Sequence, residues 1–116
     1  MSLIAIVTND LFLAAKVQAL LAPHGLDARR VAPGAVASLA APPAAVVLDL
    51  GLPPQARGEV AAWADGRLPV LAFGAHVDRD ATAWARQAGF HAVLTKGQLS
   101  ARLADALTSA LGLPPS

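Results

Sequence analysis

Short apolar runs alternate with longer alanine- and leucine-rich stretches along the whole chain. Four runs, at residues 3–7, 45–48, 69–73 and 92–94, are almost entirely apolar and rich in β-branched residues, and a more polar run at 26–32 suits an edge strand. Near-continuous apolar strands are typical of parallel sheets covered on both faces, whereas an antiparallel sheet with one solvated face shows alternation. The pattern therefore predicts a buried parallel sheet.

The stretches between the runs carry apolar residues at helical spacing. The first predicted helix follows Asn9 or Asp10, either of which suits the N-cap, and a short helix follows Pro53 and Pro54. The segment 33–43 is alanine-rich and bounded by prolines, and we expect a short helix there as well.

Two more helices are predicted in the C-terminal third. One begins after Asp78 or Asp80 and stops at Gly89, a residue typical of helix C-termini. The last has an apolar stripe within residues 99–110 and ends at Gly112. Strand followed by helix, five times over, predicts an α/β fold with a doubly wound parallel sheet.

The composition narrows the class of protein. Of the 116 residues, 55% are hydrophobic and 15% are charged, and the formal net charge is +1. This excludes a disordered chain and supplies no electrostatic reason to expect a nucleic acid partner. Cysteine is absent, and no apolar run approaches the ~20 residues of a membrane span. We expect one soluble, cytoplasmic domain over residues 1–112 with no membrane contact, and a tail or the start of a linker at 113–116.

Polar or small residues stand at the ends of four predicted strands, and in a parallel sheet these ends meet at one edge. Asp49 is the most informative, because it is a lone carboxylate that ends a buried apolar run. A partly buried acid needs a partner, and Lys96 at the end of the last strand is the natural one. We therefore expect an Asp49–Lys96 pair that ties the third strand to the fifth. The other positions are Thr8, Asn9, Asp10, Gly74, Ala75 and His76.

These strand ends lie in segments that carry a resemblance to a known family. Residues 4–10, 46–53, 69–75 and 88–96 fall in the family's order and at about its spacing. In them the chain resembles the receiver domains of bacterial response regulators (CheY-like), over nearly its whole length. The resemblance implies a flavodoxin-like (βα)5 sheet with strand order 2-1-3-4-5. It also implies a role in two-component signalling or a phosphorelay, and not that of an enzyme.

The family's chemistry indicates what these positions do. An aspartate such as Asp49 accepts a phosphoryl group, Mg²⁺ neutralises the developing charge, and a lysine such as Lys96 pairs with the product. The resemblance places the two metal-holding acids at Thr8 and Asn9, which carry no charge. Mg²⁺ prefers hard carboxylate oxygens, so this acid pocket is degenerate. Asp10 stands one residue further on, where we expect it to cap a helix.

The positions that read out phosphorylation also depart from the family. Its Ser/Thr hydroxyl position is Gly74, which has no side-chain donor, and its aromatic switch position is Val93. The residue after Lys96 is commonly proline in the family, and here it is Gly97. We therefore interpret the chain as a pseudo-receiver, which acts through phosphorylation-independent protein–protein interaction and needs no cofactor.

An alternative interpretation is a divergent phospho-receiver. Asp49 would then accept a phosphoryl group, helped by a weak Mg²⁺ site. The residues available for that site are Asn9, Asp10, Asp49 and Gly51. Mg²⁺ is expected only under this alternative.

The partner expected for a pseudo-receiver is a protein, including a second copy of the chain in a homodimer. The family often uses its fourth helix, fifth strand and fifth helix for such contacts, which correspond here to residues 78–111. No nucleic acid is expected to bind this domain. Trp84, on a predicted helix, either caps the core or, if exposed, marks an interface. We expect His76 to lie in a surface loop.

Overall fold

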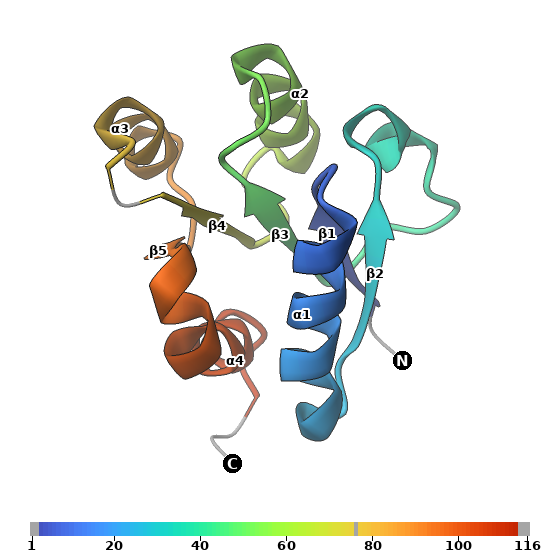
Figure 1. The fold of residues 1–116 in the computed structure, drawn as a ribbon. Helices are drawn as coiled ribbons and strands as arrows, with labels where there is room; N and C mark the ends of the chain where they lie inside the picture. The colour runs from blue at the N-terminus through green and yellow to red at the C-terminus, as the bar shows by residue number, and fades with distance from the viewer. Residues whose placement is uncertain (1–2, 76, 114–116) are drawn as a thin grey trace.

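The computed structural model describes residues 3–75 and 77–113, so His76 and the tail residues 114–116 lie outside the described residues. At its centre is a five-stranded parallel sheet with the order β2-β1-β3-β4-β5 (Figure 1). The predicted fold class and strand order are thereby confirmed. The strands are β1 (Leu3–Val7), β2 (Asp27–Val31), β3 (Ala45–Asp49), β4 (Val70–Gly74) and β5 (Ala92–Thr95).

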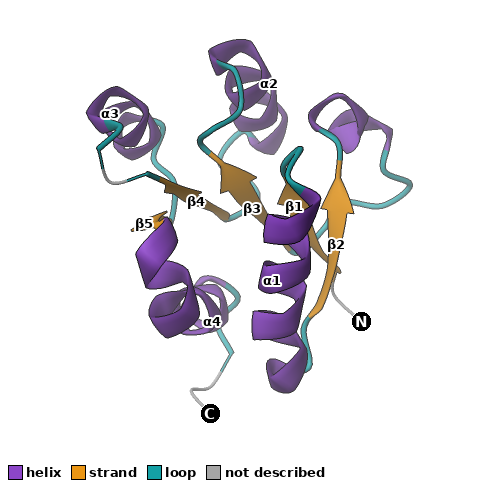
Figure 2. Ribbon diagram, viewed as in Figure 1, coloured by secondary structure: helices purple, strands orange, loops and turns teal. Residues whose placement is uncertain are grey.

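Helices cover both faces of the sheet (Figure 2). Two α-helices pack on one face, and two α-helices and a 3-10 helix pack on the other. Among the described residues, no helix combines the length and the hydrophobicity that a membrane crossing needs. The first face holds α1 (Leu11–Leu21) and α4 (Leu99–Ala110), and the second holds α2 (Pro54–Ala64), α3 (Arg79–Gln87) and the 3-10 helix η2 (Pro33–Ser38).

The short helix predicted within 33–43 is this 3-10 helix η2, which joins β2 to β3. Because η2 takes the place of a second α-helix, the helices predicted as fourth and fifth are α3 and α4 in the structure. The face expected to bind a partner is therefore α3-β5-α4. Two further 3-10 helices, η1 (Ala22–His24) and η3 (Lys96–Gln98), follow α1 and β5.

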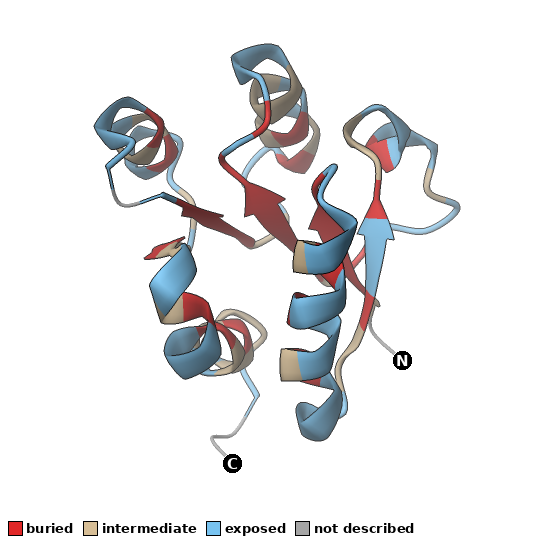
Figure 3. Cartoon of the chain, in the orientation of Figure 1, coloured by how far each residue is buried: buried red, intermediate tan, exposed pale blue. Residues whose placement is uncertain are grey.

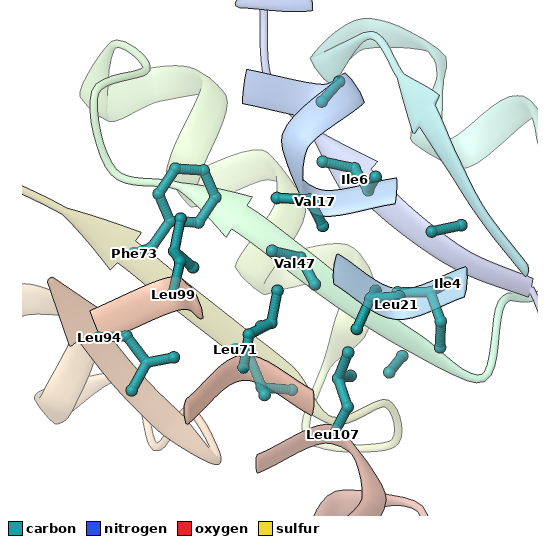
Figure 4. Packing of buried hydrophobic residues seen from close by; sticks show 14 residues of the cluster. Ile4, Ile6, Val17, Leu21, Val47, Leu71, Phe73, Leu94, Leu99 and Leu107 are labelled. Carbon is teal, nitrogen blue, oxygen red and sulfur yellow. The ribbon is translucent and has the colours of Figure 1, made fainter. Parts of the chain in front are cut away.

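The two faces of the sheet bury separate sets of side chains. Figure 3 colours β3 and β4 as buried along their whole length. Successive residues of a strand point to opposite faces, so in β1 Ile4 and Ile6 face α1 and α4 while Ala5 and Val7 face α2. Figure 4 shows the first set, in which Val47 lies among residues of the neighbouring strands and helices. Strands β1, β3 and β4 are apolar at nearly every position because both of their faces are buried, whereas the edge strand β2 carries exposed charged residues.

Side-chain caps decide between the helix starts that the sequence left open. Asp10 caps α1, where its Oδ1 accepts the Leu13 backbone N–H at 3.1 Å. Asp78 caps α3 in the same way, accepting the Ala81 N–H at 3.1 Å. The predicted stop at Gly89 is also confirmed, since this glycine takes a φ of +76° just after α3.

Candidate functional site

Asp49 ends β3 with both carboxylate oxygens already hydrogen-bonded. Its Oδ2 accepts the hydroxyl of Thr8 at 2.7 Å, and its Oδ1 accepts the backbone N–H of Gly51 at 2.7 Å. The residue is only 8% exposed. A buried carboxylate is tolerated when its oxygens are satisfied, and here neutral donors satisfy them. Asp49 thus joins the end of β3 to the residue after β1 and to the loop that leads to α2.

Thr8 is the principal partner of Asp49. The β1–β3 register pairs Val7 with Leu48, so the next residue on each strand is brought side by side. Thr8 is fully buried, and its hydroxyl donates to Asp49 while accepting the backbone N–H of Asp10 at 3.0 Å. A hydroxyl that donates to a carboxylate forms a short, strong hydrogen bond. Sequence reasoning counted Thr8 only as a lost acid and missed this role.

Lys96 does not pair with Asp49, which corrects the pair predicted from the sequence. Among the described residues, the ion pairs are Arg29–Asp27 and Arg67–Asp65, and Lys96 is exposed. The chain leaves the sheet before the lysine, because β5 ends at Thr95 and Lys96 begins η3.

A capping box stabilises the turn in which Lys96 leaves the sheet. The Thr95 hydroxyl accepts the Gln98 N–H at 3.2 Å, and the Gln98 side-chain oxygen accepts the Thr95 N–H at 3.0 Å. Two neutral donors, and not this lysine, contact the Asp49 carboxylate.

The residues proposed for a weak metal site do not form one cluster of ligands. Asn9 and Asp10 are exposed, and the Asp10 carboxylate caps α1. The Nε of Arg30 donates to the Thr8 backbone oxygen at 3.0 Å, so a cation lies at this edge of the sheet. Within the described residues there is no group of three or more His, Cys, Asp or Glu side chains suited to a metal ion. One carboxylate with both oxygens engaged is a poor ligand set for Mg²⁺.

Gly51 supports the Asp49 carboxylate through its backbone. A Cβ added at Gly51 would lie 3.0 Å from Asp49 Oδ1, so a larger residue would push against the oxygen that the Gly51 N–H binds. The glycine therefore permits the close approach of backbone to carboxylate.

The two positions that the resemblance assigned to reading out phosphorylation, Gly74 and Val93, lie against apolar neighbours. A Cβ added at Gly74 would lie 3.0 Å from the Cβ of Leu50, which is buried. Leu50 is fixed by its N–H, which donates to the Phe73 oxygen at 2.8 Å. Val93 is half-buried and packs against the small cluster that contains Leu50 and Ala72. Leu50 thus crowds the space beside Gly74, a role that the sequence analysis did not assign to it.

Trp84 is half-buried and links α2 to α3. The guanidinium carbon of Arg57 lies 5.1 Å from the centre of the Trp84 ring, and Phe90 meets the same ring edge-to-face at 5.5 Å. The Nε and Nη1 atoms of Arg57 are buried without a hydrogen-bond partner among the described residues. A cation over an aromatic face offsets part of that cost. Of the two roles expected for Trp84, the contacts match the core one.

The α3-β5-α4 face carries exposed charges of both signs. Among the ion pairs of the described residues, none involves these side chains. They are Arg79, Asp80 and Arg86 on α3, and Arg102 and Asp105 on α4.

No protein-family model matches the sequence, and no curated protein matches it either. Solved structures are similar in fold. A response regulator receiver protein from Burkholderia phymatum has a TM-score of 0.84 and 22% sequence identity, covering 98% of each chain. A receiver domain from Clostridium thermocellum has a TM-score of 0.81 and 15% identity, covering 97% of this chain and 95% of that one.

A third similar structure is the signal receiver domain of a signal transduction histidine kinase from Syntrophus aciditrophicus. It has a TM-score of 0.81 and 21% identity, covering 97% of this chain and 91% of the other. At such identities the likeness establishes the fold. The chain has the CheY-like fold of response regulator receiver domains.

Proposed function

We propose that this receiver-fold domain is a pseudo-receiver, a signalling module that acts by protein contact without phosphorylation. The observation that carries the proposal is the closed Asp49 carboxylate, which accepts the Thr8 hydroxyl at 2.7 Å and the Gly51 N–H at 2.7 Å. Each carboxylate oxygen already accepts a hydrogen bond, which makes it a weaker nucleophile toward a phosphoryl group. The nearest acid in the sequence, Asp10, uses its carboxylate to cap α1 and is therefore not available to help Asp49 bind a cation.

The apolar surroundings support the same proposal. A receiver that responds to phosphorylation needs a donor that contacts the phosphoryl oxygens and an element that moves in response. Here Gly74 offers no side-chain donor, and Leu50 crowds the space in which one would stand. Arg57 and Trp84 tie α3 to α2 in addition. We infer that the domain presents one fixed surface to its partner.

The partner surface in this proposal is α3-β5-α4. Its exposed charges of both signs form no ion pairs with the described part of the chain, and they suit either a protein partner or reciprocal pairs across a two-fold axis. We also assign the domain to the cytoplasm, because a chain without cysteine suits a reducing compartment.

Intact-mass measurement after incubation with acetyl phosphate and Mg²⁺ tests the proposal. A phosphorylatable receiver domain serves as the positive control, and Asp49→Ala serves as the negative one. We expect the control receiver to gain the mass of one phosphoryl group and this chain to gain none. A gain that disappears in Asp49→Ala would refute the pseudo-receiver and establish the phospho-receiver instead.

A further inference from the structure

A groove lies at the opposite edge of the sheet from Asp49, where the loops enter β4 and β5. It consists of two adjoining hollows of about 320 and 270 Å³. Both hollows are lined by Ala64, Arg67 and Leu68, so they form one continuous surface. A hollow near 300 Å³ is at the lower end of the size range of small-molecule sites.

The groove combines aromatic side chains with a central cation. Half-buried Phe90 lines the first hollow and half-buried Trp63 lines the second, with Arg67 common to both. The Arg67 side chain is 81% exposed, and its contact with Asp65 is 3.9 Å long between two exposed groups. Such a contact is weak, so the guanidinium is available to a ligand. None of the lining residues is acidic, and His91 is the other basic one.

The backbone before Arg67 is held in an unusual conformation. Asp65 has a φ of +47°, the one non-glycine residue with a positive φ among those described, and Gly66 follows at +69°. A left-handed conformation is unfavourable for a residue with a Cβ. The Arg67 N–H then donates to the Ala64 oxygen at 2.9 Å, which closes the turn and sets the arginine at the mouth of the groove.

The carboxyl ends of three helices lie at this groove, and their partial negative charge disfavours an anion. The lining residues Ala64 and Ala110 lie at the carboxyl ends of α2 and α4, and Ala88 caps the carboxyl end of α3. The carboxyl end of a helix carries partial negative charge, which repels an anion. Recognition of an anionic group would therefore depend on Arg67.

We propose that this groove binds a small planar aromatic anion, with its ring against Trp63 or Phe90 and its anionic group on Arg67. The charge and the aromatic walls recognise a carboxylate and a phosphate ester alike. Binding here is separate from the pseudo-receiver role, because the groove shares no residue with the Asp49 site.

Amide chemical-shift titrations with two anionic probes, indole-3-acetate and phenyl phosphate, test this proposal. The neutral indole-3-acetamide is the matched control probe. We expect at least one anion to shift the amides of residues 66–70 and 90–91 saturably. Its affinity should exceed that of the neutral amide by about fivefold. Binding of indole-3-acetate would identify a carboxylate as the preferred anionic group, and binding of phenyl phosphate would identify a phosphate ester.

The variant arm uses two arginines in similar surroundings. Arg67→Gln should weaken the anion by about fivefold, to the affinity of the neutral probe, whereas Arg29→Gln should leave it unchanged. Arg29 is a fair control because its exposed side chain also lies near an aspartate two residues away, half-buried Asp27, at 3.7 Å. Both side chains are exposed, so both variants should fold. The proposal is overturned if neither anion binds, if the neutral amide binds as tightly, or if Arg67→Gln binds as the parent does.

Discussion

The hydrogen bond between Thr8 and Asp49 should contribute measurably to stability, and Thr8→Val removes it with little change in shape. Valine keeps the branched side chain in the same buried position, so the loss is confined to the hydroxyl. That hydroxyl donates to the Asp49 carboxylate at 2.7 Å, and Asp49 is 8% exposed, so water can replace it only in part. A hydrogen bond to a charged group contributes about 1.5–3 kcal/mol. We expect Thr8→Val to lower the free energy of unfolding by about 2 kcal/mol.

Urea unfolding followed by the fluorescence of Trp63 and Trp84 measures this loss. In a separate thermal unfolding experiment, the melting temperature should fall by roughly 8 °C, at about 4 °C per kcal/mol for a domain of this size. Thr82→Val is the matched control, because the Thr82 hydroxyl donates to the Asp78 backbone oxygen at 2.9 Å at an exposed site. It should cost less than about 0.5 kcal/mol.

A double-mutant cycle separates the pair from the rest of the fold. In an Asp49→Ala background the acceptor of the Thr8 hydroxyl is gone and only the bond from the Asp10 N–H remains, so Thr8→Val should cost at least about 1 kcal/mol less than in the parent. The reasoning fails if the two substitutions are additive, or if Thr8→Val alone costs no more than Thr82→Val.

Three further predictions follow from the site and the partner surface. Lys96→Met should change the free energy of unfolding by less than about 0.5 kcal/mol in the same urea assay, because Lys96 is exposed and makes no ion pair with Asp49. A loss of stability near that of Thr8→Val would contradict this geometry. Gly74→Ala should cost about 1–3 kcal/mol by crowding Leu50, whereas Gly34→Ala, which meets nothing within 4 Å, should cost less; equal costs would contradict the crowding. If the chain dimerises through α3-β5-α4, Arg86→Glu should weaken the dimer in sedimentation equilibrium while Arg29→Glu should not, and equal effects would exclude this face.

The fold was predictable because it follows from local patterns. Strands buried on both faces are apolar at nearly every position, and parallel strands need helical crossovers, so the alternation of runs predicts both layers. The segment 33–43 was harder, since an alanine-rich stretch bounded by prolines suits an α-helix and a 3-10 helix about equally. Here only residues Pro33–Ser38 became helical.

The sequence assigned Lys96 to Asp49 as its partner, and this was wrong because the place of Lys96 depends on where β5 ends. Counting Lys96 as the last residue of the strand placed its side chain at the shared edge. The structure ends the strand one residue earlier, at Thr95. A signal for this was present in the sequence: threonine followed three residues later by Gln98 is the pattern of a capping box, which predicts a turn starting at Lys96.

The role of Thr8 needed the register of the sheet. Sequence comparison with the receiver pattern marks Thr8 as a missing acid, and only the pairing of Val7 with Leu48 brings its hydroxyl to Asp49. Leu50 was missed for a similar reason, because the sheet brings this residue, which follows β3, beside the last residue of β4, Gly74.

The central claim is that the Asp49 carboxylate is held closed by Thr8 and Gly51. The most direct test follows two backbone amides by nuclear magnetic resonance while Mg²⁺ and then beryllofluoride are added, with sodium chloride at equal ionic strength as the control. They are the Gly51 amide, which donates to Asp49, and the Asp10 amide, which donates to the Thr8 hydroxyl. The account predicts that both amides stay where the salt control leaves them, because the carboxylate keeps its two hydrogen bonds. A saturable shift of both amides that is lost in Asp49→Ala would contradict it, since it would mean that Asp49 takes up the metal ion and the phosphoryl mimic.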